Sequence, residues 1–149
     1  MKILTLLIAA FLFATCNVSN KTFSDGASWI PESFNPNSDF LLVETYAVKK
    51  ENANMEAFLR QNYPGKYEVV DRKTIMDEAG KFADIKKYRY AFVWGSTHVS
   101  INGNFHYMDP NGNFYDRAEK KDYPTTKKYN NYGQKSYIPF FNTIIKQRR

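Results

Sequence analysis

The sequence has a single cysteine, Cys16, and only two histidines. One cysteine forms no internal disulfide, so the chain is not a small domain held together by disulfides. It contains no internal repeat, no low-complexity tract, and neither a glycine-rich phosphate loop nor a dinucleotide-binding fingerprint. These absences exclude disulfide scaffolds, repeat arrays and the familiar nucleotide-binding enzymes. Apolar residues at 43% and charged residues at 24% instead indicate one ordinary folded domain within 149 residues.

The aromatic content is high, since 12 Phe, 11 Tyr and 2 Trp make up 17% of the chain. Each aromatic side chain buries a large area, so we interpret these residues mainly as core. The formal net charge is +6, but the basic residues are scattered along the chain, mostly singly or in pairs. Scattered lysines are typical of a solvated surface. We therefore expect no nucleic-acid partner despite the positive charge.

The first residues have the pattern of a secretory signal. Lys2 precedes an apolar run from residue 3 to residue 14 that only Thr5 interrupts. The run has the length of a signal segment and is too short to span a bilayer as a helix. Residues 1–15 are therefore predicted to be a signal peptide.

The run ends in Phe13-Ala14-Thr15-Cys16, which resembles the lipobox of bacterial lipoproteins, in particular the relaxed boxes of Bacteroidota. Phe13 stands where leucine is usual, and Thr15 stands where glycine, alanine or serine is usual. The resemblance implies that Cys16 becomes the lipidated first residue and attaches the chain to a membrane. Acylation would also remove an unpaired reactive thiol from an oxidising compartment. The resemblance covers residues 1–16 alone and names no family for the folded domain.

A lipid anchor implies a location in the cell envelope. The outer membrane facing the periplasm is the expected place, because no acidic run follows Cys16 to mark surface export; a freely secreted protein is the alternative. Residues 16–38 are rich in Asn, Ser, Pro and Gly and are predicted to be a flexible tether. Trp29, Ile30 and Phe34 interrupt the tether and can dock onto the domain. Residues 39–149 are predicted to form a single domain.

Hydrophobic patterning in residues 39–149 predicts an α+β domain. We expect a single mixed β-sheet of about five strands with two or three helices packed on it, including a C-terminal helix. The expected strands span residues 40–48, 66–71, 88–94, 97–101, 105–108 and 113–116. The expected helices begin at Asn52 or Asn54, at Thr74 and at Ser136. The first helix joins two strands, which indicates a parallel pair, and residues 117–135 are expected to be an irregular loop.

The strand at residues 88–94 alternates so that Tyr88, Tyr90, Phe92 and Trp94 share one face. Core packing explains this pattern best. If the face is exposed, Tyr88, Tyr90 and Trp94 are candidate binding residues, together with His98 and His106. The burial of these rings therefore decides whether an aromatic binding surface exists.

The two histidines lie in an expected hairpin around residues 102–104. A two-residue loop would pair Val99 with His106 and put His98 on the opposite face. A three-residue loop would pair Ser100 with His106, so that His98, Ser100 and His106 share a face. A metal or acid–base site becomes possible only in the second register, and a zinc site would still need a third protein ligand. We predict no metal and no cofactor.

The sequence contains no recognisable catalytic framework, and the acids on expected strands, Glu44, Glu68 and Asp116, can equally face solvent. The predicted function is that of a non-catalytic envelope lipoprotein that binds a protein or glycan partner, for example an immunity protein. The alternative is a small periplasmic hydrolase or metal-dependent enzyme that uses His98 and His106. A third hypothesis is a structural component of a larger assembly. The sequence leaves the oligomeric state open.

Overall fold

The structure is a computed structural model of the whole chain. Its described residues are 29–46, 49–95, 97–101, 105–109, 112–125 and 137–146, with the backbone alone described for 97–101 and 105–109. The predicted signal peptide, Cys16 and the cap residue Ser136 lie outside these ranges.

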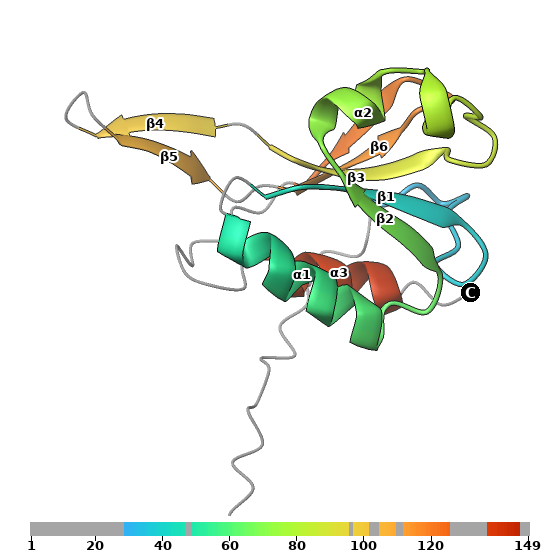
Figure 1. Cartoon of the computed structure of the whole chain (residues 1–149), viewed down its shortest axis with the longest axis horizontal. Coiled ribbons are helices and arrows are strands. Elements are labelled where there is room, and N and C mark those ends of the chain that lie inside the picture. Colours follow the sequence, from blue (N-terminus) through green and yellow to red (C-terminus); the bar gives the residue numbers. More distant parts are fainter. Residues whose placement is uncertain are drawn as a thin grey trace, which may run out of the picture.

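A five-stranded mixed sheet forms the centre of the domain, in the order β2-β1-β3-β6-β7. The strands are β1 (Phe40–Glu44), β2 (Lys66–Val70), β3 (Tyr90–Trp94), β6 (Gly112–Asp116) and β7 (Lys121–Pro124). β1 is parallel to both β2 and β3, while β3–β6 and β6–β7 are antiparallel. Together with three α-helices, one of them C-terminal, the sheet confirms the predicted α+β class (Figure 1).

Strand β1 lies inside the sheet, between β2 and β3, and its residues are apolar on both faces. Leu41, Leu42 and Val43 are all fully buried, as a continuous apolar run predicts. The chain then crosses through α1 (Lys49–Asn62), which buries Met55 and Leu59, before it returns as β2. This confirms the predicted parallel pair.

The predicted helix starts need correction. α1 begins at Lys49, ahead of the expected caps, and Asn52 instead bonds back to the N–H and the carbonyl of Tyr46. α2 (Arg72–Met76) is capped by Asp71, whose side chain accepts from the N–H of Thr74, so Thr74 lies inside the helix. A short 3₁₀ helix, η1 (Gly80–Phe82), follows and was not predicted.

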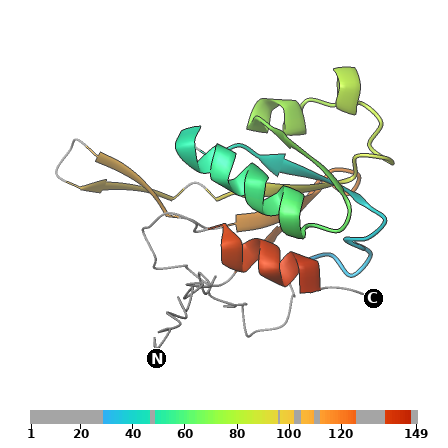
Figure 2. The ribbon, with the colours of Figure 1, turned by 60° about the horizontal axis from the view of Figure 1, so that its bottom comes forward.

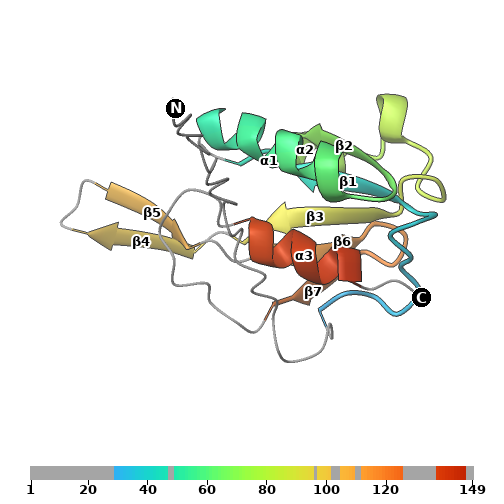
Figure 3. The same ribbon diagram turned by 90° about the horizontal axis from the view of Figure 1, so that it is seen from below.

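The helices cover opposite faces of the sheet. α1 and α3 (Ile138–Lys146) lie side by side on one face, while α2 and η1 lie on the other (Figures 2 and 3). The larger core cluster, under α1 and α3, includes Phe92, Trp94 and Phe114 from the strands and Phe140 and Phe141 from α3. The second cluster joins Leu42 and Val93 to Ile75 and Phe82. The aromatic side chains that the structure describes are thus largely core, as predicted.

The segment before β1 belongs to the folded body. Trp29, Ile30 and Phe34 are 5%, 5% and 2% exposed and pack in the larger cluster. Their predicted docking is confirmed. The packed part of the chain therefore begins no later than Trp29, well inside the stretch assigned to the tether.

Strand β3 is shorter than predicted. It begins at Tyr90, and Tyr88 precedes it in a turn in which the Tyr88 N–H donates to the Asp84 carbonyl. The turn sends Tyr88 to the second cluster, against Phe40 and Phe82, while Tyr90 packs in the larger one. The prediction that Tyr88 shares a face with the other three rings is wrong, because period-two alternation starts only within the strand.

Strands β4 (Thr97–Ile101) and β5 (Phe105–Asp109) form a two-stranded sheet of their own. Ile101 is paired with Phe105 and Ser100 with His106, which is the register of the three-residue loop. The hairpin extends away from the five-stranded sheet (Figures 1 and 2). β7, at residues 121–124, lies in the stretch predicted to be a loop, and that prediction was wrong there.

Candidate functional site

The carboxyl ends of β1 and β3 form the edge of the sheet at which a binding site is expected. α1 leaves β1 toward one face, whereas the connection that precedes β3 runs over the other face, so the winding of the sheet reverses between these strands. Open α/β sheets commonly bind ligands outside the carboxyl ends at such a reversal. The β4–β5 hairpin also leaves from this edge, directly after β3.

Glu44 occupies the end of β1 and is almost fully buried. Arg72, at the start of α2, donates through Nε to Glu44 Oε1 and through Nη2 to Oε2, both at 2.8 Å. Oε2 also accepts from the Trp94 backbone N–H at 2.7 Å, and the Trp94 indole N–H donates to the Glu44 carbonyl at 3.0 Å. Arg72 further donates to the Trp94 carbonyl. The group joins α2, β1 and β3 at one edge.

This arrangement holds structure together and does not supply an acid or a base. Both carboxylate oxygens of Glu44 are already occupied by donors. The hydrogen bond to Glu44 raises the pKa of Arg72, with the nearby charge acting in the same direction against partial burial. A carboxylate held in a two-point ion pair is strongly bound and fixed in orientation.

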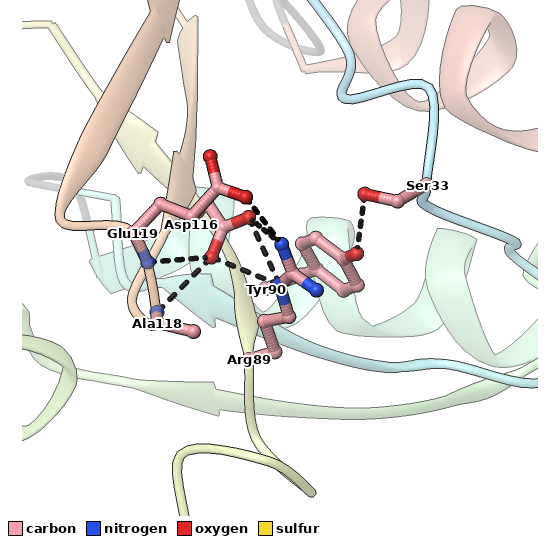
Figure 4. A network of polar contacts seen from close by, with 6 residues as sticks. All are labelled: Ser33, Arg89, Tyr90, Asp116, Ala118 and Glu119. Atoms are coloured by element: carbon pink, nitrogen blue, oxygen red, sulfur yellow. Dashed lines mark hydrogen bonds and ion pairs between the residues drawn. The ribbon is translucent and has the colours of Figure 1, made fainter.

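A second ionic group lies at the opposite end of β3 (Figure 4). Asp116 is fully buried and accepts from Arg89 Nε and Nη2, with a closest distance of 2.7 Å, and from the N–H groups of Ala118 and Glu119. Arg89 reaches Glu119 as well, at 2.9 Å. The hydrogen bond to Asp116 raises the pKa of Arg89. The group fixes the turn between β6 and β7.

Arg117 is a buried cation with a different set of partners. It is 2% exposed, and its guanidinium donates to three carbonyls: Ile75 at 2.9 Å, Tyr88 at 2.7 Å and Phe82 at 2.9 Å. Burial lowers the pKa of Arg117. These bonds tie the end of α2, η1 and the turn before β3 to the β6–β7 turn.

The strand acids do not assemble into a hydrolytic pair. Each is bound to a different cation, Glu44 to Arg72, Glu68 to Lys81 and Asp116 to Arg89. Glu44 contacts Trp94 and Asp116 pairs with Tyr90, so the two lie at opposite ends of β3, about 13 Å apart along the strand. Among the described residues, no three His, Cys, Asp or Glu side chains come close enough to hold a metal ion.

The aromatic candidates for binding are in the interior. Tyr88, Tyr90 and Trp94 are 6%, 4% and 1% exposed. The Tyr90 hydroxyl bonds to Ser33 Oγ at 2.8 Å, and the Trp94 ring packs against Tyr46, Phe92 and Phe140. These rings offer almost no surface on which a ligand could stack.

His98 and His106 lie at backbone positions of the hairpin, and their side chains are outside the described part of the chain. The register pairs His98 with Met108 and Ser100 with His106. Residues 98, 100, 106 and 108 therefore occupy one face of the ladder, because alternate positions share a face. Of the two predicted registers, the one that groups the histidines is present.

The sequence pattern did not indicate the structural roles of Glu44, Arg72, Arg89 and Arg117. An acid at the end of a buried apolar strand was the available signal for Glu44. Nothing in the local pattern identifies Arg117, since its partners come from distant segments.

Comparison of the chain with models of known families, with curated proteins and with solved structures finds no match. Within the residues that the structure describes, no helix combines the length and apolarity needed to cross a membrane.

Proposed function

We propose that this chain is a non-catalytic, lipid-anchored envelope protein that binds a protein partner through the β4–β5 hairpin. One observation carries the proposal: β4 and β5 pair only with each other, so neither outer edge is joined to another described strand. The hairpin also projects from the body (Figures 1 and 3). An unpaired strand edge offers N–H and carbonyl groups to which an extended segment of a partner can add.

The contrast with the main sheet supports a special role for the hairpin. The outer strand β7 ends in Pro124 and begins with Lys121, and it follows Lys120, which has a φ of 49°. Proline and lysine at an edge discourage pairing with another chain. Both hairpin strands lack proline.

A protein partner is favoured over a glycan by the burial of the aromatic rings. Stacking on sugars requires an exposed ring, and the described tyrosine and tryptophan candidates are interior. The charged side chains at the two ends of β3 are likewise paired with one another, Glu44 with Arg72 and Asp116 with Arg89.

The hairpin can be removed with little expected damage to the fold. Trp94 at the end of β3 pairs directly with Gly112 at the start of β6. Deletion of residues 97–109 leaves residues 95, 96, 110 and 111 to connect two adjacent antiparallel strands, a length that hairpins commonly use.

The test is capture of partners from native membranes with the full chain and with the variant that lacks residues 97–109. We expect the full chain to retain a protein that the variant does not, with circular dichroism confirming that the variant is folded. Capture of the same protein by both would contradict the proposal. So would the recovery of no protein under several extraction conditions.

The anchor is tested separately, because the hairpin and Cys16 are independent. Cys16→Ala is expected to abolish incorporation of labelled fatty acid and to move the protein from the membrane to the soluble fraction. Unchanged fractionation, with no lipid label on the wild-type chain, would refute anchoring and favour a secreted protein.

A further inference from the structure

Strand β2 forms one outer edge of the five-stranded sheet. Among the described strands only β1 pairs with it, and Figure 1 shows it at the front of the molecule with no other helix or strand drawn over it. The Val70 carbonyl accepts from the Thr45 N–H, so the backbone groups of Val70 point toward β1. Because these groups alternate in direction along a strand, those of Tyr67 and Val69 point outward. Their N–H and carbonyl groups are thus offered to a strand that joins this edge.

The side chains of β2 place charges of both signs at this edge. Lys66 is exposed, and Glu68, which pairs with Lys81 of η1, is half-buried. Lys66 and Glu68 are two positions apart and therefore share the face that η1 covers. Tyr67 and Val69 lie on the other face and pack against the larger core cluster. The edge therefore carries a lysine and an acid side by side on one face.

A second copy of β2 can join this edge antiparallel, about a twofold axis. Outward-pointing residues must face each other to exchange hydrogen bonds, so the axis lies at Tyr67, Glu68 or Val69. An axis at Glu68 puts two carboxylates directly opposite each other, which is destabilising. An axis at Val69 puts Glu68 opposite the apolar Val70. Only an axis at Tyr67 puts Lys66 of each copy opposite Glu68 of the other.

Pairing in this register is selective for a second copy of the same strand. A lysine on an edge strand discourages pairing with an arbitrary strand, but it attracts an acid that lies directly opposite. In a twofold interface every contact occurs twice, so the spacing of Lys66 and Glu68 supplies two ion pairs. Both pairs occupy positions without cross-strand hydrogen bonds, where the side chains are closest. The charges therefore favour a copy of this chain over an unrelated strand.

We propose that the chain forms a homodimer in which two β2 strands pair antiparallel about Tyr67 and join the two five-stranded sheets into one. The dimer covers an edge that, unlike β7, has no proline to protect it. It goes beyond the proposed partner interface and does not rest on it, because β2 and the hairpin belong to different sheets.

The test is sedimentation equilibrium of the purified full chain, with Cys16→Ala in every protein to prevent disulfides between chains. The parent chain is expected to dimerise. Lys66→Glu and Glu68→Lys each create two like-charged pairs across the axis and should weaken dimerisation about tenfold or more. An equimolar mixture of these two variants should form dimers again, since each pair in the mixed dimer joins an acid to a base.

Lys121→Glu is the matched control, because it makes the same charge change on β7, the other outer strand of the sheet. This variant should dimerise as the parent does. The variant that lacks residues 97–109 should also dimerise normally, which separates this interface from the hairpin. Circular dichroism shows whether each variant is folded.

Cysteine cross-linking tests the register. Lys66→Cys and Glu68→Cys, each in the Cys16→Ala chain, should form a disulfide-linked dimer on mild oxidation when they are mixed. Neither variant should do so alone, because positions 66 and 68 face each other across the axis and neither faces itself. Cross-linking of Glu68→Cys alone would place the axis at Glu68 and contradict the proposed register.

The dimer itself would be refuted by a parent chain that stays monomeric, by unchanged dimerisation of Lys66→Glu, or by a mixture of the two charge variants that stays monomeric. Loss of the dimer on deletion of residues 97–109 would place the contact in the hairpin and also overturn the proposal. Because these measurements use purified protein, they do not depend on whether a protein partner is captured from membranes.

Discussion

Arg72 and Glu44 are joined by two parallel hydrogen bonds of 2.8 Å that connect the first turn of α2 to the last residue of β1. The two residues are unequally exposed, with side chains that are 43% and 12% accessible. Removing one partner is therefore not equivalent to removing the other. Loss of the cation leaves a buried carboxylate, whereas loss of the acid leaves an arginine that water can reach.

Arg72→Ala is expected to lower the free energy of unfolding by about 2 kcal/mol, below the usual cost of breaking a buried pair because solvent screens the exposed arginine. Glu44→Gln should cost less, since the amide oxygen still accepts from the Trp94 N–H. Urea unfolding measures both. Lys73→Ala, which removes an exposed pair with Asp77, is the control and should leave stability unchanged. A larger loss in Glu44→Gln than in Arg72→Ala would contradict this account.

Arg117→Lys is expected to lower the free energy of unfolding by about 3 kcal/mol, because an ammonium group cannot reach three carbonyls in a fixed fork and buried carbonyls lose their donors. Since the partners are neutral, 1 M salt should not reduce the difference. Arg60→Lys, on the exposed side of α1, is the matched control and should behave as the wild type. Equal stability of the two variants would show that Arg117 does not tie these segments together.

The domain is expected to lose stability above pH 10. Burial raises the pKa of Tyr137 to about 12 and also raises the pKa values of Tyr63 and Tyr90. The unfolded chain releases these protons near pH 10, before the folded chain does, so stability is full below that pH and falls as the pH rises. Each such phenol contributes a slope of about 1.4 kcal/mol per pH unit.

Tyr137→Phe and Tyr63→Phe should each flatten this alkaline slope in urea unfolding between pH 8 and pH 11.5. The lysines titrate in both proteins, so the difference in slope between variant and wild type reports the phenol alone. The Tyr63 hydroxyl is buried without a hydrogen-bond partner in the described part of the chain, so Tyr63→Phe should also retain full stability at pH 7. A slope identical to that of the wild type would refute the assignment.

Gly112→Ala is expected to cost about 2 kcal/mol by overpacking, because a Cβ there would lie 2.4 Å from Cζ of Phe92 and 3.0 Å from Cδ1 of Phe140. Phe92→Leu in the same chain should recover part of the loss, so the two changes should be non-additive in urea unfolding. Gly80→Ala is the contrasting control. No heavy atom lies within 4 Å of a Cβ built at this position, so the cost of about 1 kcal/mol should come from the positive φ of 65°. It should gain nothing from Phe92→Leu, and rescue of both variants would contradict the packing explanation.

The parts of the fold that sequence could predict are those in which local pattern and tertiary role agree. The apolar run Leu41–Val43 is buried on both faces, and Met55 and Leu59 repeat at helical spacing under the sheet. The observed hairpin register is one of the two that a turn around residues 102–104 allows, so the sequence limited the register without choosing it.

The remaining parts depend on tertiary contacts. β7 has the sequence Lys-Asp-Tyr-Pro, which lacks an apolar alternation, and it is a strand because β6 pairs with it. Arg117 bonds to residues 29, 35 and 42 positions away, and Glu44 meets a tryptophan 50 positions away. No local window contains both partners, so the ionic groups at the two ends of β3 could not be found from the pattern alone.

Trp29 packs edge-on against Phe92 and Phe140 beneath the sheet, so the folded body includes Trp29 itself. The thirteen residue steps from Cys16 to Trp29 reach at most about 45 Å when fully extended. A lipid on Cys16 would thus confine the domain to a thin layer next to its membrane. Within that layer the local concentration of the hairpin is high, and a partner rooted in the same membrane could be bound effectively even with modest intrinsic affinity.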